Sequence, residues 1–129
     1  MVASSRQRIL VVDDDPGIRN VLQVGLGKAG YEVVLACDGA EALRLWQAQR
    51  ADLVITDLHM PAKNGLEVIL ELLAHSPEAR IIVMSDGGQT QQIELLGDAR
   101  LLGAILTIKK PFRLVEMMSL VSRALKWVD

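Results

Sequence analysis

Aromatic side chains are scarce in this chain of 129 residues, which has two Trp, one Tyr and one Phe. Half of the residues are nevertheless hydrophobic, so the core must be aliphatic, which suits helices packed on a sheet. The single cysteine, Cys37, excludes an intrachain disulfide, and we expect it to be a small buried residue at a strand end. No apolar run is long enough to predict a membrane span, and no signal core follows the N-terminus.

An excess of positive charge is absent as well. The chain has 14 basic and 16 acidic residues, and it lacks the basic stripe that typifies nucleic-acid binding. We therefore expect a cytoplasmic protein that binds neither nucleic acid nor a membrane. The length predicts a single domain with a substantial core, which we place at residues 8–129, after a tail at residues 1–7.

Short apolar runs alternate with helical patterns along the whole chain. The expected strands are residues 8–12, 32–36, 53–56, 80–84 and 105–108. Five helices are expected between and after these strands. The first carries Ile18, Val21, Leu22 and Leu26, the second follows a cap at Asp38, and the third runs from Gly65 to Pro77. The last two span about 91–102 and 114–127. This alternation predicts an α/β domain whose parallel sheet is flanked by five helices. Right-handed crossovers would bring the carboxyl ends of the strands to one edge, where ligands bind.

Polar residues stand at the carboxyl ends of four of these strands. They are Asp13, Asp14 and Asp15 after the first strand, Asp57 after the third, Ser85 after the fourth, and Lys109 and Lys110 after the fifth. Clustered carboxylates repel one another unless a cation joins them, and oxygen ligands of this kind suit Mg²⁺. A carboxylate, a metal, a lysine and a hydroxyl are the groups needed for phosphoryl transfer onto an aspartate. Taken singly, each residue could instead cap a helix, as Asp15 before Pro16 would.

Five motifs occur in the order found in receiver domains of two-component response regulators. They are ILVVDDDP, DGAEAL, DLVITDLHMPAKNGLEVI, IIVMS and KKPF, and the chain resembles that family from about residue 8 to residue 127. The resemblance implies a doubly wound, flavodoxin-like sheet of strand order 2-1-3-4-5. It also implies that Asp57 accepts a phosphoryl group from a phosphohistidine of a sensor histidine kinase or a phosphotransfer protein.

The resemblance implies a magnesium site around the same aspartate. Asp14 and Asp57 would bind Mg²⁺ through their carboxylates, and His59 would bind it through its backbone carbonyl. Asp13 would act mainly through water. Such a protein is not a conventional enzyme, and at most it catalyses its own aspartyl phosphorylation and dephosphorylation.

The remaining site residues include two departures from the family pattern. Ser85 matches the hydroxyl that binds the phosphoryl oxygens and Lys110 matches the site lysine, whereas Lys109 would face away. Asp86 stands where the family usually has a small residue, so it either hinders the incoming anion or caps the next turn. Thr107 stands where the family usually has an aromatic switch. The spacing from Ser85 to Lys110 is also longer than usual by about one helical turn.

The output of the chain is open to two interpretations. With no aromatic switch, we expect phosphorylation to rearrange residues 86–92 and to shift the face formed by the helix at 91–102, the strand at 105–108 and the last helix. That face would include Ile105, Leu106 and Trp127, and it could also form a homodimer. The alternative is a pseudo-receiver that binds partners without turning over phosphate. The start at Met1 and the end at Asp129 favour a stand-alone receiver over a piece of a longer regulator.

Overall fold

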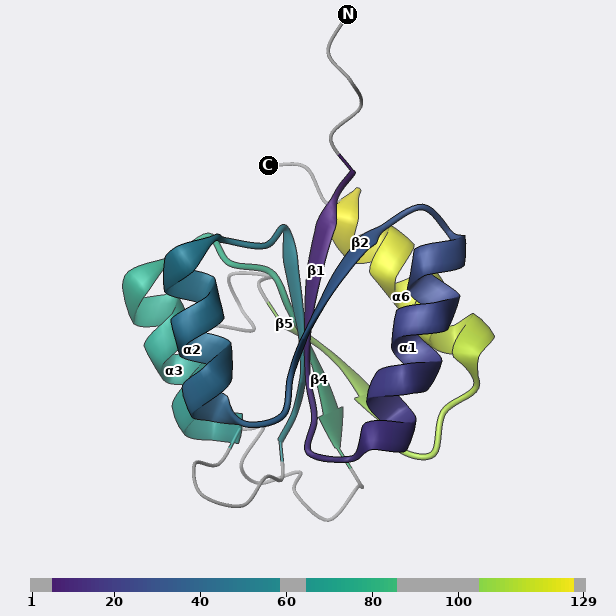
Figure 1. The fold of residues 1–129 in the computed structure, drawn as a ribbon, viewed down its shortest axis with the longest axis horizontal. Coiled ribbons are helices and arrows are strands. Elements are labelled where there is room, and N and C mark those ends of the chain that lie inside the picture. The colour runs from purple at the N-terminus through teal and green to yellow at the C-terminus, as the bar shows by residue number, and fades with distance from the viewer. Residues whose placement is uncertain (1–5, 59–64, 86–104, 127–129) are drawn as a thin grey trace, which may run out of the picture.

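Residues 6–58, 65–85 and 105–126 are described by the computed structural model (Figure 1). Several of the sequence expectations lie outside these residues. They are the helix at 91–102, the loop at 86–92, and the residues His59, Asp86 and Trp127.

Five parallel strands form one sheet in the order β2-β1-β3-β4-β5. The strands are β1 (Arg8–Val12), β2 (Glu32–Ala36), β3 (Leu53–Asp57), β4 (Ile81–Ser85) and β5 (Ile105–Lys109). The expected α/β fold and its strand order are confirmed. Three strands extend one residue further than expected, and β3 and β4 therefore end on Asp57 and Ser85 themselves. Both side chains are thus carried by hydrogen-bonded strands rather than by loops.

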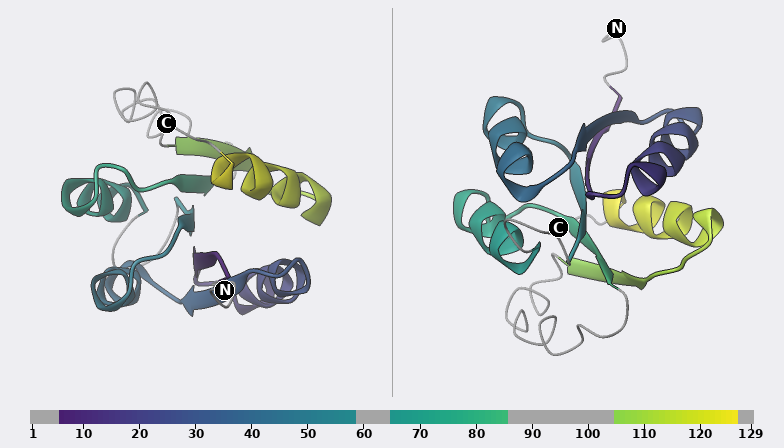
Figure 2. Two further views of the ribbon diagram at one scale, coloured as in Figure 1. Left: turned by 90° about the horizontal axis from the view of Figure 1, so that it is seen from above. Right: turned by 60° about the horizontal axis from the view of Figure 1, so that its bottom comes forward.

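Helices cover both faces of the sheet, as Figures 1 and 2 show. The helices of the described residues are α1 (Pro16–Lys28), α2 (Gly39–Ala48), α3 (Gly65–His75) and α6 (Leu114–Leu125). The pair α1 and α6 lies on one face, and the pair α2 and α3 lies on the other. Within these ranges, no helix is both long and apolar enough to cross a membrane.

The core consists of two apolar layers, one on each side of the sheet. Successive strand side chains point to opposite faces, so Leu10 of β1 packs toward α2 and α3 while Ile9 packs toward α1 and α6. Every residue of β3 and β4 is buried, as expected for central strands covered on both faces. Trp46 of α2 is buried and donates a hydrogen bond from Nε1 to the Ser76 hydroxyl at 3.2 Å.

The turn after β2 differs from the sequence expectation in the burial of its cysteine. Cys37 is exposed, so the prediction of a buried cysteine at the strand end was wrong. The strand ends at Ala36, which is buried, and the next side chain lies at the rim of an edge strand. The Cys37 amide donates to the Glu41 carboxylate at 2.7 Å, and Asp38 caps α2 by accepting from the Glu41 amide at 2.8 Å. The expected Asp38 cap is confirmed.

Candidate functional site

The β1–α1 turn brings three acidic residues to the carboxyl edge of the sheet, at the bottom of Figure 1. The Asp13 amide donates to the Ala36 carbonyl at 3.1 Å, which continues the pairing of β1 with β2 past the end of β1. Asp15 then caps α1 by accepting from the Gly17 amide at 2.8 Å, with Pro16 at the first helical position. The turn is therefore anchored at both ends, and Asp14 lies between the anchors.

Three carboxylates from two strand ends meet at this edge. One oxygen from each of Asp13, Asp14 and Asp57 lies within 4.8 Å of the others. Asp13 and Asp57 are buried, whereas Asp14 is exposed. Parallel pairing of β1 with β3 sets Val12 opposite Thr56, so the residues that follow are neighbours. Three carboxylates at this separation repel one another when ionised, which favours a cation beside them.

Lys110 supplies one such cation. Its Nζ lies 2.9 Å from Oδ2 of Asp13 and 3.0 Å from Oδ2 of Asp57, and 20% of its side chain is exposed. The Lys110 amide donates to the Ser85 carbonyl at 2.6 Å, which ties the residue to the end of β4. The Lys110–Pro111 peptide bond is cis. Lys109, by contrast, is exposed.

Burial and pairing act in opposite directions on these charges. Burial raises the pKa of the Asp13 carboxyl above its ordinary value, although the Asp15 amide and the Lys110 ammonium oppose that change. Burial alone would lower the pKa of Lys110, but its hydrogen bonds to Asp13 and Asp57 outweigh burial and raise it. Lys110 is therefore firmly protonated, whereas Asp13 is costly to keep ionised at neutral pH.

The donor set fits a hard cation such as Mg²⁺. All three side chains offer carboxylate oxygens, which Mg²⁺ prefers, usually with several water ligands. Both oxygens of Asp13 already accept hydrogen bonds, Oδ1 from the Asp15 amide at 2.9 Å and Oδ2 from Lys110. The exposed Asp14 carboxylate makes no hydrogen bond with other residues in the described part of the chain. This arrangement leaves Asp14 open for direct coordination and suits Asp13 to contact through water.

The remaining candidate residues from the sequence lie on β4, on β5 or outside the described ranges. Ser85 is buried at the end of β4, the strand that pairs with β3. Thr107 is exposed on β5, and Leu106 is partly buried against the core layer of α1 and α6. His59 and Asp86 lie outside the described residues. Of the candidates, the structure thus brings together three aspartates and Lys110.

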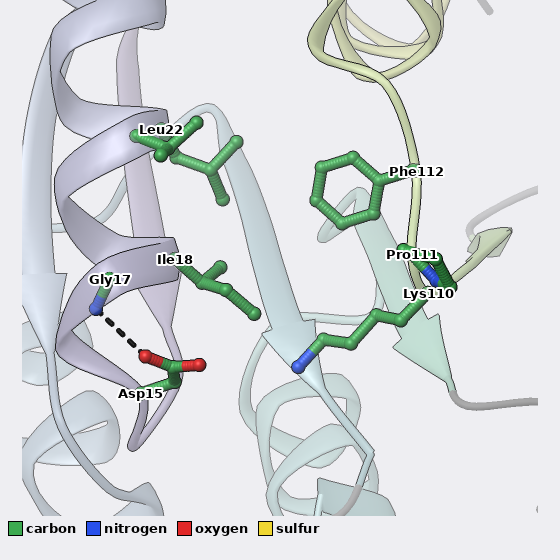
Figure 3. Close-up of a pocket in the computed structure, with 8 residues that line it drawn as sticks. Asp15, Gly17, Ile18, Leu22, Lys110, Pro111 and Phe112 are labelled. Atoms are coloured by element: carbon green, nitrogen blue, oxygen red, sulfur yellow. Dashed lines mark hydrogen bonds between the residues drawn. The ribbon is translucent and has the colours of Figure 1, made fainter.

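An apolar pocket that the sequence did not reveal lies beside Lys110 (Figure 3). It has a volume of about 610 Å³ and lies between the N-terminal half of α1 and the segment that follows β5. Its lining consists of Asp15, Gly17, Ile18, Val21, Leu22, Lys110, Pro111 and Phe112. The sequence groups Val21 with the apolar residues of this helix, whereas the structure leaves it 50% exposed at the pocket. The pocket therefore adjoins the acidic cluster through the lysine that both share.

Arg19 is a further feature of this edge that the sequence did not predict. Its Nη1 donates to the backbone carbonyl of Asp13 at 2.6 Å, and the side chain is partly buried. The signal was a basic residue at the fourth position of α1, near a helix N-terminus, where positive charge is unfavourable. The acidic edge thus has two cations: Arg19 binds a main-chain carbonyl, and Lys110 binds the carboxylates.

Comparisons with known proteins agree with this geometry. Residues 9–122 match the family described as response regulator receiver domain. The chain is 31% identical over 119 residues to sporulation initiation phosphotransferase F of Bacillus subtilis, covering 92% of this chain and 94% of that protein. It is 43% identical over 122 residues to the DNA-binding transcriptional regulator NtrC of Azospirillum brasilense, covering 94% of this chain but 24% of the longer protein. The solved structure of response regulator protein TrrA from Thermotoga maritima, in complex with Mg(2+)-BeF, matches with a TM-score of 0.81 and 36% identity, over 92% of this chain and 99% of that one.

Proposed function

The chain belongs to the response regulator receiver domain family, and from that premise we propose that Asp57 accepts a phosphoryl group from a phosphohistidine of a sensor histidine kinase or phosphotransfer protein. One observation carries this proposal. The Asp57 carboxylate ends a buried strand, lies 3.0 Å from the Lys110 ammonium, and has Asp13 and Asp14 within 4.8 Å. A nucleophile is thereby held rigidly beside cationic and metal-binding groups at the open edge of the sheet.

The transfer step follows from these groups. A carboxylate oxygen of Asp57 attacks the phosphorus, the bond from phosphorus to the histidine nitrogen of the donor breaks, and that nitrogen leaves with the electron pair. The product is an acyl phosphate on Asp57 and a free imidazole on the donor. Lys110 already pairs with the attacking carboxylate, so it can neutralise charge on the phosphoryl oxygens without a large movement. The Ser85 hydroxyl, at the end of the adjacent strand, is the proposed hydrogen-bond donor to those oxygens.

Asp14, Asp57 and the backbone carbonyl of His59 are the residues we propose for binding Mg²⁺, with Asp13 acting through water. When bound, Mg²⁺ would supply positive charge that lowers the repulsion between the acids and the incoming phosphoryl group. The open Asp14 carboxylate and the engaged oxygens of Asp13 support this division of roles.

The phosphodonor protein would also contact the apolar pocket of Figure 3. Lys110 lines this pocket and also pairs with Asp57, so the pocket lies next to the point at which a donor would place its phosphohistidine. Ile18, Val21 and Phe112 offer it apolar contacts, and the half-exposed Val21 loses water when covered. This surface lies on the α1 side of the molecule, away from α2 and α3.

Signalling is proposed to follow from the added charge. Phosphorylation replaces a single carboxylate charge with about −1.5 to −2. The Lys110 ammonium and the Ser85 hydroxyl would move to match this added charge. Thr107 offers no aromatic ring as a switch, so we propose that residues 86–92 and the face that contains β5 and α6 rearrange, and that this face contacts a downstream protein or a second copy of the chain. In the pseudo-receiver alternative, which the Thr107 and Asp86 departures keep open, the face would bind partners without phosphorylation.

Intact-mass measurement after treatment with acetyl phosphate and Mg²⁺ tests the proposal. The wild-type chain should gain one phosphoryl group, and Asp57→Asn should gain none. Asp15→Asn is the matched control, because Asp15 is an exposed acid of the same edge and asparagine preserves its cap. Equal labelling of Asp57→Asn would refute the acceptor assignment. A wild-type chain that takes no label, but still responds to Mg²⁺, would support the pseudo-receiver.

A further inference from the structure

Arg19 breaks a local rule of helix electrostatics at the edge of the proposed site. It is the fourth residue of α1, and a cation near a helix N-terminus is opposed by the helix dipole. No carboxylate in the described part of the chain lies within ion-pair distance of it, so an ion pair does not offset that cost. Local rules are most often broken where a residue has a functional task.

The task is indicated by the atom that Arg19 binds. Its Nη1 donates to the carbonyl oxygen of Asp13 at 2.6 Å, and that carbonyl belongs to the peptide group that links Asp13 to Asp14. A peptide group is planar, so holding its oxygen also sets the direction in which the Asp14 backbone leaves it. Asp14 itself is exposed, and it lacks a hydrogen bond to its side chain from the other described residues. The orientation of its carboxylate therefore depends on how well the main chain beneath it is held.

The choice of a main-chain acceptor also matters for a metal. A guanidinium paired directly with Asp14 would compete with a cation for its oxygens, whereas a guanidinium on the Asp13 carbonyl leaves them open. The Asp13 amide is held by Ala36 and the Asp15 amide by Asp13 Oδ1, so Arg19 completes the set of contacts that fix this turn.

We propose that Arg19 is a positioning residue for the divalent cation, which it serves by fixing the Asp13–Asp14 peptide and so holding the Asp14 carboxylate in place for Mg²⁺. The inference rests on the proposed function, since it takes Mg²⁺ as the ion of the acidic cluster. It predicts an effect on the magnesium requirement rather than on the chemistry at Asp57, because Arg19 contacts neither the acceptor nor Lys110 by hydrogen bond or ion pair.

Calorimetric titration of the full chain with Mg²⁺ tests this role. Arg19→Met removes the donor but keeps an apolar stem, and it should weaken Mg²⁺ binding about tenfold, the lower end of the range seen when a group that orients a metal ligand is lost. Arg19→Lys keeps a charged donor and should fall between Arg19→Met and the wild type. Arg44→Met is the control, because Arg44 is an exposed arginine of α2 with one ion pair, to Glu41 at 3.7 Å. It should bind Mg²⁺ as the wild type does.

Two further measurements separate positioning from a structural role. In EDTA, the melting temperature of Arg19→Met should stay close to that of the wild type, because the loss of the hydrogen bond to the Asp13 carbonyl is partly offset by the removal of a cation from the helix N-terminus. At saturating Mg²⁺, acetyl phosphate should label Arg19→Met at the wild-type rate, so that only the Mg²⁺ concentration needed for half-maximal labelling rises.

Unchanged Mg²⁺ affinity in Arg19→Met would overturn the inference. A loss of metal-free stability in Arg19→Met, together with wild-type affinity in Arg19→Lys, would assign Arg19 to folding and would overturn it as well. Failure of the proposed function has a different signature, because the wild-type chain itself would then show neither a heat of Mg²⁺ binding nor labelling by acetyl phosphate.

Discussion

Replacing Lys110 with methionine would leave two buried carboxylates without the ammonium they share. The Asp13 side chain is fully buried and that of Asp57 is 9% exposed, while Nζ lies 2.9 and 3.0 Å from them. Removing one partner of a buried ion pair costs about 3–5 kcal/mol. Asp13 can relieve part of this cost by taking up a proton, and we therefore expect a loss of about 2–3 kcal/mol near neutral pH in EDTA. For a domain of this size, that loss lowers the melting temperature by about 6–15 °C.

The sign of the pH dependence follows from Asp13. Burial raises its folded-state pKa above the ordinary value of 3.8, so the folded chain holds this proton more tightly than the unfolded chain does. The resulting penalty on folding is present above the folded-state pKa and disappears as the pH falls below 3.8. Lys110 opposes that rise in pKa, so its removal raises the pKa further and enlarges the penalty at neutral pH. The deficit of Lys110→Met should therefore shrink steadily as the solution is acidified.

Urea denaturation of the wild type and Lys110→Met in EDTA, from neutral pH to about pH 4, measures both effects. Lys109→Met is the matched control, because Lys109 is exposed and should change stability by no more than about 0.5 kcal/mol. Above neutral pH, the raised pKa of Lys110 means that the wild type keeps this stabilisation until the pH rises through that folded-state value. A Lys110→Met protein as stable as the wild type at neutral pH, or a deficit that does not change with pH, would refute this reasoning.

Three smaller changes test other parts of the account. Asp14→Asn should abolish the rise in melting temperature that Mg²⁺ gives the wild type; a normal rise would exclude Asp14 as a ligand. Asp15→Ala removes the cap on the Gly17 amide and should cost about 1 kcal/mol in urea denaturation; an equal loss in Asp15→Asn would contradict the cap. Trp46→Phe removes the buried hydrogen bond to Ser76 and should cost about 1 kcal/mol in the same assay; an unchanged stability would mean that this bond contributes nothing.

The convergence of the acids and the lysine could be predicted because topology dictates it. Parallel strands joined by right-handed crossovers must end at one edge, so Asp13, Asp57 and Lys110 become neighbours although 97 residues separate the first from the last. Alternating strands and helices were equally predictable, since their hydrophobic periods differ. The predicted ends of β3 and β4 each fell one residue before the observed ends. A polar side chain at a strand tip breaks the apolar run of the sequence without ending the hydrogen-bonded ladder.

Side-chain details depended on information that hydrophobic patterns do not contain. Cys37 was expected inside because its type is usually buried, but its position just past an edge strand decided its exposure. Arg19 has a long side chain with many rotamers, and its hydrogen bond to Asp13 depends on the turn it folds over. The pocket beside Lys110 required α1 and the segment after β5 to be placed in space, which no local pattern does.

The central claim is that Asp57 itself receives the phosphoryl group, and site mapping of the modified chain tests it most directly. The wild-type protein is treated with acetyl phosphate and Mg²⁺, reduced with borohydride so that an aspartyl phosphate becomes homoserine, and digested for peptide sequencing by mass spectrometry. Homoserine should appear at position 57 and not at Asp13 or Asp14, which compete most directly among the described residues because their carboxylates lie within 4.8 Å of the acceptor. Homoserine at Asp13 or Asp14 with Asp57 intact, or at no position under conditions in which Mg²⁺ binds, would contradict the account.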